Sequence, residues 1–236
     1  KLTSEFEISA ATSGLSIVSQ PNITQLPVLA DSLTALTLIA NPKITRVDFS
    51  SATSSLRTLH LSDTPIEEFT GAEQIRSIYS LTLDGQVKLS DADFPGTEIT
   101  SDLTLSGAVQ FRGFNFQKPA KEYDHALNSL SLAANDDADL SSLSSLSRVR
   151  HLSIVGSELT NLNALENLTG ASTVNISDNT LLTDMSALED LDHTNSWSSS
   201  TPAMNFVRNP LITDSELGRF YVTLIGSMER GSGIEE

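Results

Sequence analysis

Aliphatic residues recur along this chain at nearly constant spacing, in a phrase of the form L-x-x-L-x-L-x-x-N-x-x-L. The phrase is clearest at Leu33, Leu36, Leu38, Asn41 and Ile44. The first aliphatic residue of each inner pair, here termed the marker, occurs nine times, at Leu15, Leu36, Leu59, Leu81, Leu103, Leu130, Leu152, Val174 and Met204. Six of the eight steps between markers lie within one residue of 22, and the other two are 27 and 30. A period in the low twenties predicts one small unit stacked on copies of itself.

Each marker is predicted to lie in a short β-strand. The marker and the residue two places after it point to one face of an extended strand, and their neighbours point to the other face. A single unit buries little apolar surface. Stacking is therefore expected to place Leu36, Leu59, Leu81 and Leu103 in one column of the core. Nine strands at a spacing of about 4.8 Å predict a parallel sheet roughly 40 Å long.

The outward strand positions are the default binding surface of such an array. The residue between the two inner positions is polar in every unit, and six of the nine carry a hydroxyl: Ser16, Thr37, His60, Thr82, Thr104, Ser131, Ser153, Asn175 and Asn205. Small hydroxyl side chains suit a pleated sheet in their own right, because they fit the pleat and contact each other across strands. The same column also suits a shallow polar groove for an extended partner or a glycan. Both interpretations stay open.

Side chains large enough to anchor a partner are few on the predicted sheet. Arginine and aromatic residues usually dominate binding energy at interfaces. Arg57, His60 and Tyr79 come from the third and fourth units, so they are predicted to form one patch. Arg150 and His151, in the seventh unit, are further candidates.

The first long step marks an insertion over residues 110–126, which concentrates aromatic and basic residues in a chain that is only 6% aromatic. Long loops on rigid scaffolds commonly carry recognition, so Arg112, Phe116 and Tyr123 are predicted partner contacts. For Phe111 and Phe114, a buried core position is as strongly expected as an exposed one. The second insertion, residues 192–202, holds the chain's single tryptophan, Trp197, which either folds back on the array or anchors a partner.

A terminal repeat exposes its apolar face unless something covers it. One domain over residues 1–236 is predicted, with an N-terminal cap over 1–12, repeats over 13–214, a capping helix over 215–229 and a flexible tail over 230–236. Thr213 and Glu216 have capping-box spacing. The apolar residues that follow recur at helical intervals: Leu217, Phe220, Tyr221, Leu224 and Met228.

The net charge and the composition limit the classes of partner that are expected. The net charge is −16, and residues 122–236 hold seventeen acidic and five basic residues. This field repels phosphate backbones and anionic lipids, so nucleic acid and membrane surfaces are not expected partners. No apolar run approaches the roughly 18 residues of a membrane-spanning helix. Cysteine is absent, which excludes disulfides and Cys-based metal sites.

No catalytic constellation emerges, and no cofactor or metal is expected. The four histidines lack ligand spacing, and no nucleophile elbow or phosphate loop is present. Asp136, Asp137 and Asp139 form an acidic cluster without the register of a calcium loop. The sequons at Asn22, Asn167 and Asn175 are as many as chance provides, so they give no evidence of secretion.

The repeat phrase resembles the leucine-rich repeat family over residues from about 13 to 214. The stretch 143–168 is similar to the 22-residue internalin-like subclass, and Asn41-Pro42-Lys43-Ile44 and Asn209-Pro210-Leu211-Ile212 are similar to receptor L-domain-like and fungal cell-wall relatives. The resemblance implies an α/β repeat solenoid, a right-handed horseshoe or superhelix. About nine parallel strands would line its concave face, opposite a convex side of extended or 3-10 segments.

The resemblance also implies a ladder of polar side chains five residues after each marker, where an amide would satisfy backbone groups of the turn. This chain has Gln20, Asn41, Thr64, Gln86, Ala108, Asn135, Ser157, Asn179 and Asn209 there. Ala108 cannot form such a bond, so its turn is expected to be irregular.

These features predict a non-enzymatic recognition module, placed outside the cell or on its surface. A protein partner is expected to contact Arg57, His60, Tyr79 and the aromatic insertion. Two alternatives stay open: a glycan-binding cell-wall adhesin that uses the hydroxyl column, and a structural spacer within a longer surface protein. Neither the oligomeric state nor the partner's identity follows from the sequence.

Overall fold

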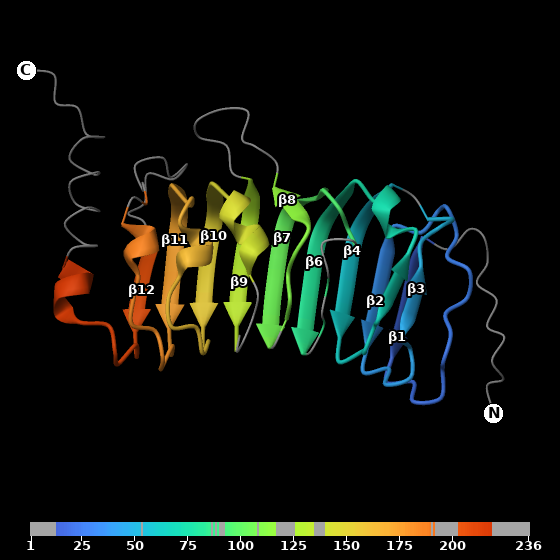
Figure 1. Ribbon diagram of the computed structural model, residues 1–236, viewed down its shortest axis with the longest axis horizontal. Coiled ribbons are helices and arrows are strands. Elements are labelled where there is room, and N and C mark those ends of the chain that lie inside the picture. The colour runs from blue at the N-terminus through green and yellow to red at the C-terminus, as the bar shows by residue number, and fades with distance from the viewer. Residues whose placement is uncertain are drawn as a thin grey trace, which may run out of the picture.

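The protein is a parallel-strand solenoid (Figure 1). The computed structural model describes residues 13–218 except 53, 86, 88, 90–92, 108, 117–125, 135–139, 190 and 192–202. Within these residues nine strands follow one another across the main sheet: β1 (Gly14–Val18), β2 (Ala35–Ile39), β4 (Ser55–Ser62), β6 (Ser77–Gly85), β7 (Thr97–Gly107), β9 (Leu127–Ala133), β10 (Arg148–Val155), β11 (Gly170–Ser177) and β12 (Ala203–Val207).

The register of the sheet confirms the predicted stacking. All the strand pairs are parallel, and each marker lies opposite the next, from Leu15 with Leu36 to Val174 with Met204. Leu36, Leu59, Leu81 and Leu103 are all fully buried. The evenly spaced aliphatic residues therefore form one continuous core, as their period predicts.

The segments between the strands are extended or 3-10 in character, as expected. β3 (Arg46–Asp48) and β5 (Glu68–Thr70) form a second, two-stranded parallel sheet. The 3-10 turns among the described residues are η1 (Ala72–Gln74), η2 (Ser141–Ser145), η3 (Asn163–Leu165) and η4 (Ser186–Leu188). Figure 1 shows these return segments crossing one face of the main sheet. None of the helices in the described part of the chain is long and apolar enough to span a membrane.

The first insertion contributes to the core. Its strand β8 (Phe114–Phe116) pairs with the first half of β7, and β9 pairs with the second half. Phenylalanine rings pack in a chain with centroid separations of 4.7 to 6.5 Å: Phe49, Phe69, Phe94, Phe111, Phe114 and Phe116. The core interpretation of Phe111 and Phe114 is thus confirmed. The prediction that Phe116 is a partner contact is wrong, because it is 8% exposed and packs against Phe111.

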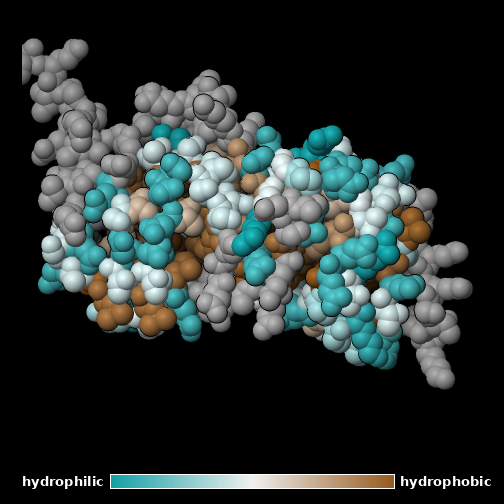
Figure 2. All heavy atoms as spheres, in the orientation of Figure 1, coloured by the Kyte–Doolittle hydropathy of each residue, from teal (hydrophilic) through white to brown (hydrophobic). Residues whose placement is uncertain are grey.

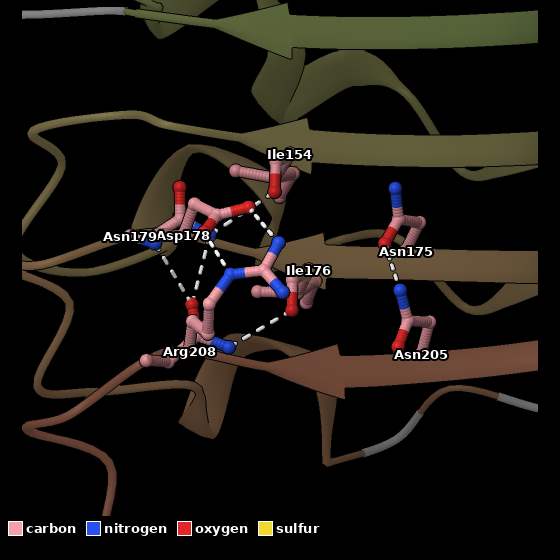
Figure 3. Close-up of polar contacts among 8 residues, drawn as sticks. Ile154, Asn175, Ile176, Asp178, Asn179, Asn205 and Arg208 are labelled. Atoms are coloured by element: carbon pink, nitrogen blue, oxygen red, sulfur yellow. Dashed lines mark hydrogen bonds and ion pairs between the residues drawn. The ribbon is translucent and has the colours of Figure 1, made fainter.

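The polar ladder is present in the turns that the structure describes. The Asn209 amide donates to the Ile176 carbonyl at 2.8 Å, and its oxygen accepts the Asn179 backbone N–H at 3.0 Å (Figure 3). Asn179 repeats the pattern one unit earlier, with the Ile154 carbonyl and the Ser157 N–H. Asn41 does the same in the second unit. The ladder positions 86, 108 and 135 lie outside the described residues.

Every turn also has a left-handed residue immediately before the ladder position, a feature that the sequence did not predict. These nine residues are Ser19, Ala40, Asp63, Gly85, Gly107, Ala134, Gly156, Asp178 and Arg208, with φ between 45° and 81°. Six of them are not glycine, although the left-handed region disfavours side chains. The tight exit from each strand therefore imposes this conformation, whichever residue occupies the position.

At the C-terminal side of the array, the structure describes the start of a helix. The Glu216 carboxylate accepts the Thr213 N–H at 2.9 Å, and the Thr213 hydroxyl accepts the Glu216 N–H at 3.3 Å, which is the expected capping box. Residues 214–218 form a helical turn. The predicted N-terminal cap, the rest of the helix and the tail lie outside the described residues.

Candidate functional site on the exposed sheet face

The face of the main sheet that points away from the core, here the exposed sheet face, carries the predicted polar columns in register. Ser16 lies opposite Thr37, and the same column continues strand by strand to Asn175 and Asn205. Most members of this column are half-buried by their neighbours. The face is therefore continuous, polar and shallow.

Many of these polar groups bond to each other across strands. The Asn128 amide donates to Asp102 at 3.0 Å, and the Asn205 amide donates to Asn175 at 2.9 Å (Figure 3). The Ser62 hydroxyl donates to Asp84 at 3.1 Å. These contacts support the interpretation that part of the polar column serves the sheet itself.

Larger side chains lie on the exposed sheet face where the strict alternation of buried and exposed residues along a strand is interrupted. In β4 both Leu56 and Leu59 are buried, so the two residues between them, Arg57 and Thr58, face outward together. Their two backbone N–H groups share one acceptor, the Thr34 carbonyl, at 2.6 and 3.2 Å. Two adjacent residues on the same face, with a shared acceptor, are typical of a β-bulge, which re-aims a side chain. This outward pair recurs in other strands, and the first of its two residues is the bulge position.

The bulge position holds the bulkiest exposed side chains of this face. It is Arg57 in β4, Tyr79 in β6 and Arg150 in β10, each preceded by a buried aliphatic residue. β7 lacks the outward pair, and its side chains alternate regularly up to Leu103. The signal for this arrangement was present in the sequence, because an aliphatic residue three places before the marker, as in Leu56 and Ile78, leaves two residues between buried positions.

The structure brings together three of the predicted site residues, here termed the Arg57–Tyr79 patch: Arg57, His60 and Tyr79. Arg57 and Tyr79 occupy equivalent positions on neighbouring strands, between the registered pairs Leu56–Ile78 and Thr58–Ser80. Tyr79 is 54% exposed, and His60 is half-buried opposite Thr82.

Electrostatics distinguish the members of this patch. Burial lowers the pKa of the His60 imidazole, and the negative charge of Asp84 offsets part of that shift. Within the described ranges, the Arg57 guanidinium has no hydrogen-bond or ion-pair partner, whereas that of Arg46 pairs with Glu68 at 3.5 Å. The Arg57 guanidinium is therefore available to a ligand as far as the described structure extends.

The other predicted contacts do not join this patch. Arg112 is exposed, in the segment between β7 and β8, and so does not lie on the main sheet. Tyr123 and Trp197 lie outside the described residues. Among the described residues, the exposed sheet face therefore carries Arg57, His60 and Tyr79 of the predicted contacts.

The described histidines lie far apart on the main sheet. His60 and His151 lie on β4 and β10, with three strands between them, and no group of three potential metal ligands occurs in the described ranges. The acidic cluster Asp136, Asp137 and Asp139 lies outside those ranges. A cavity of about 320 Å³ lies among the return segments, next to Leu140, Leu159 and Leu162, and not on the exposed sheet face.

Comparisons with protein-family models, with curated proteins and with solved structures found no match. The function is therefore inferred from the surface itself.

Proposed function

We propose that this protein is a non-catalytic recognition module of the leucine-rich-repeat type, which binds a protein partner through the exposed sheet face. The Arg57–Tyr79 patch is the proposed centre of contact, with Arg112 as a secondary contact. By its internalin-like resemblance, the module acts outside the cell or on its surface.

The observation that carries the proposal is the pair of outward side chains on neighbouring bulges. Tyrosine and arginine are the residue types most enriched among binding hot spots, since each combines a large contact area with a polar group. Tyr79 exposes 54% of its surface on a face where most side chains of the central column are small and polar. A partner that covers Tyr79 would exclude water from Arg57 and so strengthen a bond from its guanidinium to a carboxylate.

The rigidity of the array favours this use. The strands that carry the patch are held by registered neighbours on both sides. A preorganised surface loses little conformational entropy on binding, which improves affinity for a given contact area. A structural spacer, the second interpretation, requires no such exposed anchor.

The test compares two baits in quantitative affinity capture: the wild-type domain and Arg57→Ala/Tyr79→Ser. Captured proteins are then purified and their Kd values measured directly. The proposal expects a partner whose Kd rises at least tenfold, or about 1.4 kcal/mol, in the double variant. Arg46→Ala is the matched control, because Arg46 is an exposed arginine on the second sheet. A partner that binds the double variant as tightly as the wild type would refute the proposed patch.

A further inference from the structure

A second group of basic side chains lies on the exposed sheet face, on strand β10. Arg148, Arg150 and His151 fall within four consecutive residues. They lie in the half of the chain where acidic residues outnumber basic ones by seventeen to five. This concentration is separate from the Arg57–Tyr79 patch on β4 and β6, because β7 and β9 lie between β6 and β10.

The contacts of these residues leave positive charge unneutralised. Arg150 is exposed and, in the ranges that the structure describes, its guanidinium has no hydrogen-bond or ion-pair partner. Arg208, by contrast, forms a two-bond pair with Asp178. Asp102 on β7 is two strands from β10, about 10 Å away, and its carboxylate already accepts bonds from Ser101 and Asn128.

The neighbouring side chains hold this charge in place. The Nδ1 atom of His151 lies 2.9 Å from the Thr173 hydroxyl, which leaves the Nε2 atom for another group. Arg148 packs over Gly170, since a Cβ added there would lie 2.8 Å from the Arg148 Cζ. The Arg148 Nε is buried, and no residue of the described part bonds to it. A fixed, partly desolvated cation raises the local positive potential more than a solvated one does.

Short polar side chains surround the basic group. Ser131, Ser153 and Asn175 lie side by side on β9, β10 and β11, at strand spacings of about 4.8 Å. Hydroxyl and amide groups both donate and accept hydrogen bonds, as the hydroxyls of a sugar do. Tyr79, the exposed aromatic of the Arg57–Tyr79 patch, is distant, on β6.

We propose that strands β9–β11 bind a sugar that carries a carboxylate. The carboxylate pairs with Arg150 and with His151 Nε2, and the sugar hydroxyls bond to Ser131, Ser153 and Asn175. Two observations favour a sugar over an acidic protein segment. Large aromatic anchors typical of protein interfaces are absent from these three strands. The net charge of −16 also repels a polyanion far more than it repels a single carboxylate.

The test is a backbone amide NMR titration of the intact domain with glucuronate, and with glucose as the neutral control. On a shallow face, a ligand of this size is expected to bind with a Kd of about 1 mM. Arg150→Gln is the test variant. Arg46→Gln is the control, because Arg46 is an exposed arginine on the second sheet, outside both proposed binding surfaces. The amide spectrum of each variant also reports whether its fold is intact.

The proposal expects glucuronate to shift the amides of β9–β11 saturably, and glucose to have no effect. Arg150→Gln should raise the Kd at least tenfold, and Arg46→Gln should leave it within about twofold. Absence of shifts at about 50 mM glucuronate, or an unchanged Kd in Arg150→Gln, would overturn it. Equally tight binding of N-acetylglutamate would also overturn it, because the site would then recognise a peptide carboxylate and not a sugar.

Discussion

At the scale of single residues, the asparagines of the ladder each make several hydrogen bonds to the backbone of neighbouring turns and strands. Asn179 is fully buried, donates to Ile154 and Asn209, and accepts the Ser157 N–H. Asparagine suits the position because one amide can both donate to a strand carbonyl and accept from a turn N–H. The turn groups that it satisfies have no strand partner of their own.

Removal of this amide should be costly. Asn179→Ala leaves the buried Ile154 carbonyl and the Ser157 N–H without their partner, which is expected to lower the free energy of unfolding by about 3 kcal/mol. Asn175→Ala, on the exposed sheet face of the preceding strand β11, serves as the control. It should cost less than about 1 kcal/mol, because water can replace its bond to Asn205. Urea denaturation measures both, and equal losses would contradict a special role for the ladder.

The left-handed turn residues allow a second comparison, between two glycines with different surroundings. A Cβ added at Gly107 would lie 2.5 Å from the Gly85 carbonyl oxygen, whereas one at Gly156 would meet nothing within 4 Å. Both φ angles are positive, so either change to alanine should cost about 1 kcal/mol from backbone strain. Gly107→Ala should lower the free energy of unfolding clearly more than Gly156→Ala, because the backbone at Gly85 must move to make room for the new Cβ. Thermal and urea unfolding of both variants test this difference.

At the scale of elements, three pairs of hydrogen-bonded polar side chains connect the β11 and β12 repeats. Asn175–Asn205, Asp178–Arg208 and Asn179–Asn209 connect equivalent positions on the two strands (Figure 3). This junction has the longest step, 30 residues between markers, and still keeps full register. Leu181 and Leu211 lie just beyond these strands, 43% and 48% exposed, and Figure 2 shows apolar surface at that end of the molecule.

The ion pair of this junction should titrate. Hydrogen bonds from Arg208 lower the pKa of the Asp178 carboxyl. A carboxyl whose pKa is lowered by folding contributes stability above its unfolded pKa of about 3.9, and loses that contribution as pH falls through its folded pKa. Arg208→Ala should return the Asp178 pKa towards its ordinary value, as measured by carboxyl ¹³C NMR titration. Arg46→Ala, which breaks a distant pair, should leave the Asp178 pKa unchanged.

The aromatic core links the second sheet to the insertion. The Phe94 ring is fully buried, with its centroid 6.0, 5.2 and 5.5 Å from those of Phe49, Phe69 and Phe114. Phe94→Ala should therefore lower the free energy of unfolding by about 4 kcal/mol, through lost burial and the cavity left behind. Phe94→Leu fills most of that cavity and should recover more than half of the loss. Full recovery is not expected, because leucine lacks the ring contacts. Urea denaturation of both variants measures the two losses of unfolding free energy, and equal losses would contradict the expected role of cavity volume.

At the scale of the whole molecule, the sequence determines the periodic part of the fold and leaves its exceptions undetermined. All nine markers stack as predicted, because a side chain one place out of register would move from the core to the opposite face. The same periodicity could not place Phe116, since an insertion interrupts the spacing from which burial is inferred. The left-handed turns were also missed, because six of nine lack glycine, the usual signal for that conformation.

The candidate site, like the fold, could be predicted from the sequence only in part. Arg57 and Tyr79 were recognisable as large side chains among small ones, and their adjacency follows from the repeat register. Their exposure depends on the outward pair, which alternation alone does not predict. The cross-strand bonds that occupy Asp102, Asn128 and Asn175 depend on side-chain geometry, so the sequence could not separate the free polar groups from the satisfied ones.

Because each repeat contacts only its neighbours, the position of a defect in the array should determine how far its effect spreads. Leu81 is fully buried between Leu59 and Leu103, and Leu15 lies on the first described strand of the sheet with 7% exposure. Leu81→Ala is expected to cost about 4 kcal/mol, and Leu15→Ala about 2 kcal/mol, since a terminal strand can relax around the cavity.

Hydrogen exchange separates the two cases. Leu81→Ala should reduce amide protection on both sides of β6, because the units on either side lose a stabilising interface. Leu15→Ala should reduce protection in β1 and β2, and leave β9–β11 unchanged. Loss of protection confined to β6 in Leu81→Ala would mean that the repeats open independently. The exposed sheet face would then lack the rigidity on which both proposed binding sites depend.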